Sequence, residues 1–406
     1  MTAPLFGYMG TKRYLAPHVV RAILNVARPG PIVDLFAGTG SVSTALAQAG
    51  RDVVANDVMA FICCLQRAQL LRIGEEVTST TADHILSHAS SGIADRSRRF
   101  AARRKLDRDA ISAEPARLLD HMSRVSARPV CSDPQDYNLI TSYFGSCYFS
   151  TDQSIALDSL RQSIDSLFPS SEESTSVNHW SGSTVRDIAM SAWLLTAHSV
   201  SNTTGHGAQY MKATSATGYT RICRNWRRDV VSRFMAYFVR LLGRNSLLSR
   251  PGNRVAFGDA LLFFARCDSD SPFGAAYADP PYTKDQYSRM YHLHETLYLY
   301  DYPAVGGIGL ARNDRFISSF SLKSRALDSI LQLVKACRAA GSPLVLSYPK
   351  SGLIPLQEEF LYLAAQDGAE PAVTTMDELE VRHSRMGAAG GFLPHVQVVE
   401  RVFSIA

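Results

Sequence analysis

The residues in this chain best suited to chemistry form the tetrapeptide Asp279-Pro280-Pro281-Tyr282, which follows an apolar run over residues 272–277. We expect it to lie where a buried strand ends. Two consecutive prolines have a fixed φ and no N–H, and the first pushes Asp279 toward an extended conformation. This stiff turn suits a flat ring that bears an amine, because carboxylate and carbonyl accept from the amine while Tyr282 stacks on the ring. An ordinary loop with a proline pair is the alternative, since short motifs recur by chance.

A glycine turn forms the second candidate element. Residues 32–36 are an apolar strand-length run, residues 37–40 read Ala-Gly-Thr-Gly, and residues 42–49 have the apolar spacing of a helix. Residues 51–57 then read as a second strand that ends in Asp57. The pattern predicts a βαβ unit, and ligands of open parallel sheets bind at the carboxyl ends of the strands.

The glycine spacing narrows the class of ligand. Ser43 stands where a dinucleotide fingerprint has its third glycine, and no Walker A lysine follows the turn. A nucleotide with a pyrophosphate is therefore disfavoured. A ligand that carries a ribose but no phosphate fits better, with Asp57 accepting from the ribose hydroxyls, and S-adenosylmethionine is such a ligand. The alternative for Asp57 is a helix cap.

The composition indicates a globular protein with two to three domain-sized units. The 406 residues are 46% hydrophobic and 19% charged, with a formal net charge of +5. The seven cysteines form no CxxC pair and show no zinc-like spacing with histidine, so we expect reduced, structural cysteines and no metal site. No signal peptide or membrane-spanning apolar run is evident, which favours a cytoplasmic protein.

The strand–helix alternation fades over residues 76–244, which we interpret as an inserted, mainly helical region. It carries a basic run over residues 96–108 and a second cluster at Arg221, Arg224, Arg227 and Arg228, with Tyr219 and Trp226 interleaved. Guanidinium groups beside aromatic rings suit a nucleic-acid surface, although a solvated helix face is the commoner fate of a charge run. Residues 169–176 and 201–218 are expected to be loops.

After residue 250 the alternation returns. Strands are expected over residues 254–259, ending in Gly258-Asp259, and again over 343–348 and 396–403, with a helix over 325–340. The predicted fold is therefore α/β, a Rossmann-like domain with a mixed, mostly parallel sheet. Its two parts, residues 1–75 and 245–406, would form one catalytic domain, and residues 76–244 the target-recognition insert.

The order of these parts resembles a known family. A glycine-punctuated turn with Lys12, then Phe36-Ala37-Gly38-Thr39-Gly40, a long basic insert, Gly258-Asp259 and Asp279-Pro280-Pro281-Tyr282 is similar to the Dam-like, D12-class amino-methyltransferases of DNA. In that permutation group, target recognition lies between the FxGxG and DPPY motifs. The resemblance is clear over residues 5–60 and 254–350, whereas the insert matches nothing that we can place.

The resemblance implies a role for each matched residue. Asp57 would bind the ribose of S-adenosylmethionine and Asp259 its adenine amino group. Asp279 and the Pro280 carbonyl would accept from the target amine, with Pro281 completing the corner and Tyr282 stacked on an extruded base. The other cofactor-binding residues would be Tyr8, Gly10, Lys12, Asp34, Phe36, Gly38 and Gly40.

These roles imply an S-adenosylmethionine-dependent methyltransferase acting on adenine N6 in DNA. Cytosine N4 is the alternative target, because it is also an exocyclic amine, and Asp rather than Ser at position 279 favours adenine. A catalytically silent nucleic-acid-binding module is a further alternative, and an RNA or protein amine is a less favoured substrate. A dinucleotide oxidoreductase would not explain Pro280-Pro281. Such enzymes often serve restriction–modification, other phage defence or housekeeping marking of DNA, and the first two roles would involve a restriction or defence-system partner protein.

Overall fold

The computed structural model describes residue 12 and residues 14–73, 77–126, 136–169, 185–267, 273–357, 374–383 and 396–405. Tyr8 and Gly10, and most of the loop expected over residues 169–176, lie outside these described residues.

The described residues form a seven-stranded sheet with the order β3-β2-β1-β4-β7-β9-β8. The first five strands pair in parallel, and β9 pairs antiparallel with both of its neighbours. This confirms the predicted α/β class with a mixed, mostly parallel sheet. The strands are β1 (Ile32–Asp34), β2 (Val53–Asp57), β3 (Arg254–Phe257), β4 (Ala275–Ala278), β7 (Leu344–Pro349), β8 (Thr374–His383) and β9 (Val396–Ile405).

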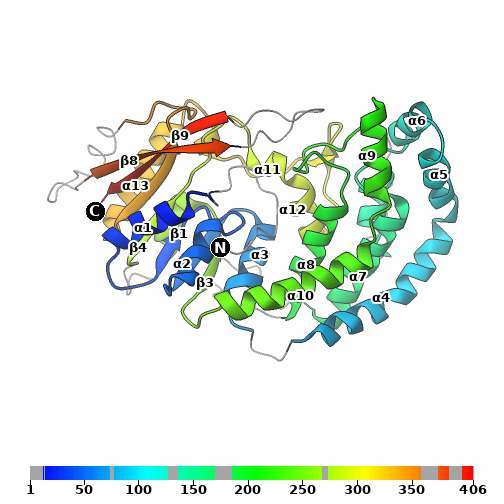
Figure 1. Ribbon diagram of the computed structural model, residues 1–406, viewed down its shortest axis with the longest axis horizontal. Coiled ribbons are helices and arrows are strands. Elements are labelled where there is room, and N and C mark those ends of the chain that lie inside the picture. The colour runs from blue at the N-terminus through cyan, green and yellow to red at the C-terminus, as the bar shows by residue number, and fades with distance from the viewer. Residues whose placement is uncertain are drawn as a thin grey trace.

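Both faces of the sheet are covered, which explains the continuous apolar runs in its strands. Successive residues of a strand point to opposite faces, so Ile32 packs into one core and Val33 into another. Helices α1 (Ala16–Val26) and α2 (Ser41–Gln48) cover the first face, and α13 (Ala326–Ala339) covers the second (Figure 1).

Helix α3 (Ala60–Leu70) joins the sheet to the helical part of the molecule. Cys63 packs into the sheet core and Cys64 into the helical core, so the two adjacent thiols lie on opposite sides of one helix. Burial raises the pKa of Cys63 well above its usual value and that of Cys64 to about 12. The described cysteines are all free, consistent with the structural role expected for them.

A helical half separates β2 and α3 from β3 in the chain, and Figure 1 shows it beside the sheet. It surrounds a large core that contains Trp193 and Phe144. The loop predicted over residues 201–218 ends earlier, because the Ser215 hydroxyl accepts from the Gly218 N–H at 3.1 Å and begins a helix. The helices are α4 (Ser79–Arg99), α5 (Ala101–Ile111), α6 (Pro115–Ser126), α7 (Thr151–Leu167), α8 (Val185–Val200), α9 (Ala216–Trp226) and α10 (Val230–Leu248), with a π-helical turn at Ile140–Phe144.

The first basic run serves this helical half. Arg96 is buried and donates to the carbonyl oxygens of Tyr137 and Asp136, and Arg103 donates to those of Thr141 and Gly145. Other arginines of the run pair with nearby aspartates. These guanidinium groups therefore satisfy backbone carbonyls and carboxylates within the helical half.

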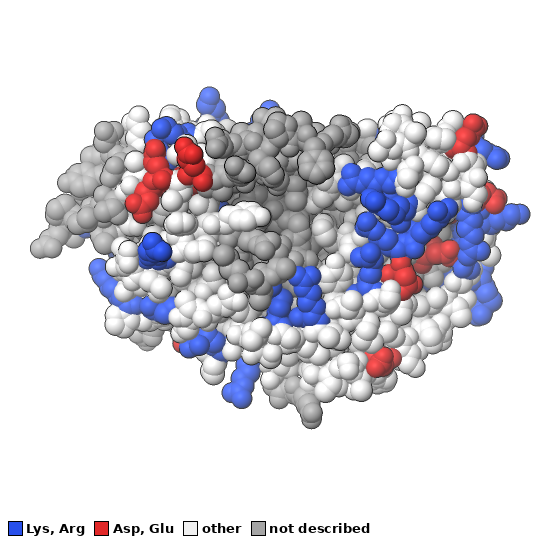
Figure 2. Space-filling view, in the orientation of Figure 1, with Lys and Arg blue, Asp and Glu red and all other residues white. Residues whose placement is uncertain are grey.

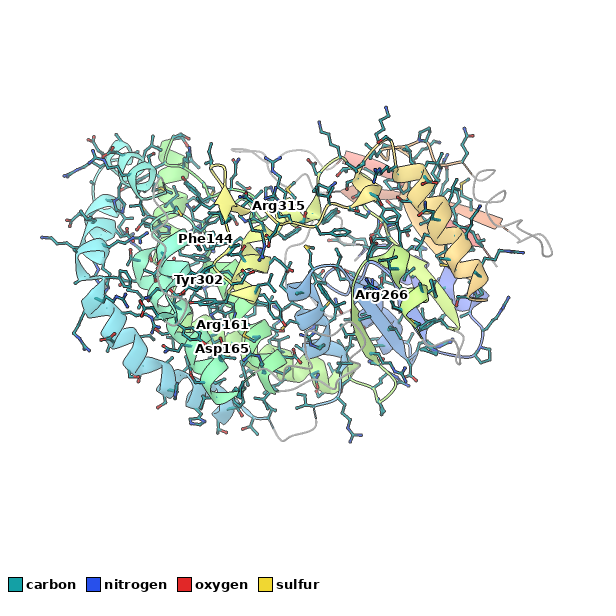
Figure 3. The ribbon with its side chains drawn as sticks, turned by 180° about the vertical axis from the view of Figure 1, so that it is seen from behind. Phe144, Arg161, Asp165, Arg266, Tyr302 and Arg315 are labelled. Atoms are coloured by element: carbon teal, nitrogen blue, oxygen red, sulfur yellow. The ribbon has the colours of Figure 1, made fainter. Side chains whose placement is uncertain are left out.

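The turn Asp279-Pro280-Pro281-Tyr282, here called the proline corner, is followed by a stretch rich in tyrosine and histidine over residues 287–302. This aromatic stretch forms α11 (Tyr287–Met290) and α12 (His292–Leu299). Arg161 of α7 donates to the carbonyls of Leu297 and Tyr298 at 2.9 and 2.8 Å, and Figure 3 shows it beside Asp165, with which it pairs. At the other end, the Glu295 carboxylate accepts from the first backbone N–H groups of α3. The stretch thus ties the helical half to the chain that follows Asp57.

Three short 3-10 turns, Ala260–Leu262, Phe264–Arg266 and Ser319–Ser321, and a small antiparallel pair, β5 (Val305–Gly306) and β6 (Ala311–Arg312), complete the described elements. Among the helices of the described residues, none combines the length and apolarity needed to cross a membrane.

Candidate active site

A cavity of about 980 Å³, including its open mouth, lies at the carboxyl ends of β1, β2, β3 and β4. This is the edge at which a doubly wound sheet binds its ligands. The glycine turn and the proline corner, more than two hundred residues apart in the chain, both border it. The predicted site residues that line it are Lys12, Asp34, Phe36, Gly38, Asp57, Asp259, Asp279, Pro281 and Tyr282.

Two predicted residues, Gly40 and Pro280, are not among the lining residues. Gly40 precedes α2 with φ +85°, a conformation that favours glycine, and a Cβ there would lie 2.7 Å from Gln66 Oε1. Pro280 is buried between Asp279 and Pro281. The contribution of Gly40 is therefore the shape of the turn and not a contact across the cavity.

The carboxylate of Asp57 holds the glycine turn. It accepts from the Gly38 N–H at 3.0 Å and from the Met59 N–H at 2.9 Å, just before α3. The cap-like bonding considered from the sequence is thus present, while the same side chain also borders the cavity. Ionised carboxylate oxygens have about four acceptor positions in total, so acceptor capacity remains for a ligand.

Ser43, at the position of the missing third glycine, has a structural partner. It is buried and donates to Asp34 Oδ2 at 2.5 Å. Asp34 Oδ1 is also buried and has no hydrogen-bond partner within the described residues. A buried acceptor that borders a cavity is suited to a donor on a ligand.

Asn56 is a positioning residue that the sequence did not reveal. Its Nδ2 donates to the Leu35 carbonyl at 3.1 Å and to the Gly258 carbonyl at 3.2 Å. It therefore fixes the ends of β1 and β3 relative to β2, and with them Phe36 and Asp259. The signal for it in the sequence is a polar residue within an otherwise apolar strand.

A buried ionic group lies behind the proline corner. Lys12 Nζ lies 3.1 Å from Asp279 Oδ1 and 2.5 Å from Glu400 Oε1, and 5.1 Å from the centre of the Tyr282 ring. Glu400 of β9 is fully buried, whereas 16% of the Asp279 side chain remains exposed. The lysine thus connects the corner to the last strand of the sheet.

Glu400 was missed because it stands in an alternating strand where a lone Glu usually faces solvent. Alternate residues of a strand point to the same face of the sheet, and Val402, two residues after Glu400, is buried in the sheet core. The alternation therefore could have indicated that Glu400 points inward. What no local pattern shows is its partner, Lys12, which lies 388 positions away in the chain.

Burial dominates the electrostatics of the site. It raises the pKa of Asp34 to about 7 and that of Asp57 to about 6. Burial also raises the pKa of Asp279 to about 7, where Lys12 opposes the rise and Glu400 adds to it. The pKa of Lys12 is raised by Asp279 and then Glu400, although burial acts in the opposite direction, so its ammonium stays charged.

The charge pattern suits a cationic ligand. Four aspartates line the cavity, whereas its described lining residues include a single lysine, Lys12, and no arginine. A phosphate would meet several carboxylates, whereas a sulfonium or ammonium group would meet favourable partners. Within the part of the chain that the structure describes, no group of three or more metal-binding side chains is arranged to hold an ion.

The second basic cluster lies apart from this cavity. Arg221, Arg224 and Arg227 are exposed, whereas Arg228 is partly buried and donates to the Ser199 carbonyl. Of the two interleaved rings, Trp226 is buried and Tyr219 is partly buried. Trp226 is only 5% exposed, and the Tyr219 hydroxyl donates to the Ile111 and Ala113 carbonyls.

Comparison with known proteins agrees with the geometry. Residues 8–116 match the family model of the D12 class N6 adenine-specific DNA methyltransferases. The chain is also 23% identical over 356 residues to the modification methylase LlaI of Lactococcus lactis subsp. lactis, covering 86% of this chain and 47% of that protein. The chain therefore spans about half the length of this curated relative. The proline corner lies beyond the residues that the family model matches.

Proposed function

We propose that the chain transfers a methyl group from S-adenosylmethionine to the N6 amine of an adenine in DNA, because residues 8–116 match the D12 class N6 adenine-specific DNA methyltransferase model. The observation that carries this proposal is the shared cavity, in which the glycine turn and the proline corner face the same space. A donor and an acceptor bound there would be held side by side.

The residues present fit S-adenosylmethionine. The unsatisfied Asp34 Oδ1 offers an acceptor to an ammonium group, and Asp57 keeps acceptor positions for ribose hydroxyls. Asp259 borders the cavity beyond β3, where it would accept from an adenine amino group. Lys12, Phe36 and Gly38 complete the wall around the methionine part. When bound, the cofactor supplies a methyl group already activated by its positive sulfur.

The chain's own task is to make the amine nucleophilic and to align it. An exocyclic amine is a poor nucleophile because its lone pair is delocalised into the ring. Hydrogen bonds from its two protons to Asp279 and the Pro280 carbonyl favour a pyramidal nitrogen whose lone pair is available, with the base stacked on Tyr282. Alignment of this kind contributes about 7–11 kcal/mol to lowering a barrier.

Further parts of the proposal follow from charge and position. Residues 76–244 would form the target-recognition region. In it, the exposed Arg221, Arg224 and Arg227 would neutralise phosphates, and Arg228 would hold the helix segment that carries them in place. The relative's name, a modification methylase, supports a role in restriction–modification or other phage defence with a partner protein. The protein would then work in the cytoplasm, where the DNA is.

The test is incubation with S-adenosylmethionine labelled on its methyl group and a mixed DNA substrate, followed by identification of the labelled base. N6-methyladenine is expected. Label on N4 of cytosine would show that the target is the cytosine amine and not the adenine amine. Retarded DNA without any label would mean a silent binding module. Single-molecule sequencing of DNA from cells that express the protein would give the modified base and its sequence context together.

Replacing Asp57 with alanine should weaken cofactor binding. The change removes the proposed ribose acceptor and also releases the Gly38 N–H, so we expect a loss on the order of tenfold or more in affinity. Asp52→Ala is the matched control, because Asp52 precedes β2 and pairs with Arg250 outside the cavity. Calorimetric titration with S-adenosylmethionine decides the point, and equal affinities for both variants and the wild type would rule out this role.

The rate of transfer should depend on the ionisation of Asp279. Because the pKa of this carboxyl is raised to about 7, the accepting carboxylate is lost as pH falls through 7, and kcat/KM should fall with it. Glu400→Gln removes a negative charge that adds to this rise. The acid limb of its pH profile should therefore move to lower pH, by about one unit or more. A limb that stays in place would exclude Glu400 from the electrostatics of Asp279.

A further inference from the structure

Helix α9 has two faces of opposite character. Its buried face carries Ile222, Cys223 and Trp226, which pack into the helical core. Three to four positions apart on the other side, the exposed residues are Thr217, Thr220, Arg221 and Arg224. Such spacing places these side chains on a single face of the helix. This face is polar and basic along its length and carries no acidic residue.

This face borders a second cavity, of about 1860 Å³ with its open mouth, which lies beside the active site. Three segments line it: residues 204–215, the first turns of α9, and residues 284–290 just beyond the proline corner. Gln286 lines both this cavity and the active-site cavity, so the two lie next to each other. The basic residues around it are Lys212, Arg221, Lys284 and Arg289, and Asp285 is the acid among its lining residues.

The positive charge of α9 is not neutralised within the protein. Among the described residues, no carboxylate forms an ion pair with Arg221, Arg224 or Arg227. This contrasts with the run over residues 96–108, where arginines are bound by carbonyls and aspartates. Figure 2 shows basic side chains gathered over α9 and the start of α10. Burial lowers the pKa of Arg228, and the neighbouring guanidinium groups of Arg233, Arg224 and Arg221 lower it further.

We propose that α9 is the element that reads the DNA sequence beside the extruded base, with Thr217 and Arg221 at base edges and Arg224 and Arg227 at phosphates. The inference rests on the proposed function and extends it to sequence choice. An α-helix fits the major groove of a duplex, where arginine recognises guanine through two hydrogen bonds and threonine contacts base edges. Thr217 and Arg221 line the cavity next to Gln286, whereas Arg224 and Arg227 lie outside it along the chain.

Sequence selection separates base reading from attraction to phosphates. The full-length protein retains duplexes from a random library, and the retained DNA is sequenced. Arg221→Ala should lower discrimination at one or more base positions, on the order of tenfold to a hundredfold, while sparing the others. Arg221→Lys keeps the charge and loses the planar fork, so it should bind DNA well but discriminate poorly. Arg98→Ala, on α4 outside both cavities, is the matched control for loss of an exposed arginine.

Each result decides the proposal. Loss of preference in Arg221→Ala and Arg221→Lys, with the wild-type preference kept in Arg98→Ala, supports it. Full preference in Arg221→Lys would reduce Arg221 to a phosphate contact and overturn it, as would retention of duplexes without any enriched sequence, or retention of a competing RNA in place of the duplex. Because the selection needs no catalysis, a protein that enriches a sequence but transfers no label refutes the proposed function and not this inference.

Discussion

Replacing Asp279 with alanine should lower methyl transfer by about a hundredfold to a thousandfold, while S-adenosylmethionine still binds. Losses of this size accompany removal of one well-placed partner of a transition state. The variant removes an acceptor for the target amine, yet the residues proposed to hold the cofactor, such as Asp34 and Asp57, keep their places. Single-turnover transfer to DNA and calorimetric binding of the cofactor measure the two effects separately.

Two further variants control this experiment. Asp279→Asn keeps one acceptor oxygen and should lose less activity than the alanine variant. Asp328→Ala removes an exposed aspartate from the first turn of α13 and should leave transfer unchanged. If Asp279→Ala turned over DNA at the wild-type rate, the amine would have to be activated elsewhere. If it lost cofactor binding along with transfer, Asp279 would belong to the cofactor site.

Replacing Lys12 with methionine should have the largest effect on stability. Asp279 and Glu400 would then share a buried space without their cation, and removal of one partner from a buried pair costs about 3–5 kcal/mol. One of the two carboxyls would keep its proton at neutral pH. Because folding raises the pKa of Asp279 above its unfolded value, and the loss of Lys12 removes the charge that opposes this rise, the free energy of unfolding should fall further as pH rises from about 4 to 7. Urea unfolding at several pH values measures this.

The double variant Lys12→Met/Glu400→Gln tests the cause. It removes one of the two uncompensated charges, so it should regain part of the lost stability, and the gain would appear as a coupling energy between the two sites. We expect low methyl transfer in both the single and the double variant, because each lacks the lysine beside Asp279 and Tyr282. Strictly additive effects on the free energy of unfolding would show that Lys12 and Glu400 do not act as one ionic group.

The local elements followed from the sequence because their causes are local. The strand–glycine–helix pattern of residues 32–49 was predicted from apolar spacing and two glycines, and β1 and α2 appear there in the structure. The prolines after β4 mark the end of a strand in any context, since they lack an N–H for the sheet ladder. The loop expected over residues 201–218 ends earlier than predicted, because Ser215 caps the start of α9.

Charged residues were the least predictable part, because their role depends on what surrounds them. The run over residues 96–108 and the cluster over residues 221–228 look alike in the sequence. In the structure, arginines of the first run bind carbonyls and aspartates, whereas Arg221, Arg224 and Arg227 of the second are exposed. Trp226 was expected to be available for stacking and is buried, and the Tyr219 hydroxyl is bound by a backbone carbonyl.

By itself, the sequence determined the chemistry at hand: a carboxylate on a proline corner, a glycine turn, an acid at a strand end, and their order along the chain. The tertiary structure decided which of them meet. Strand order brings β1 and β4 side by side, and β9 carries Glu400 to Lys12 across 388 positions. Periodicity and turn residues act over a few bonds and can be read from one segment. Burial of a charge and the choice of its partner are properties of packing, which only the folded chain defines.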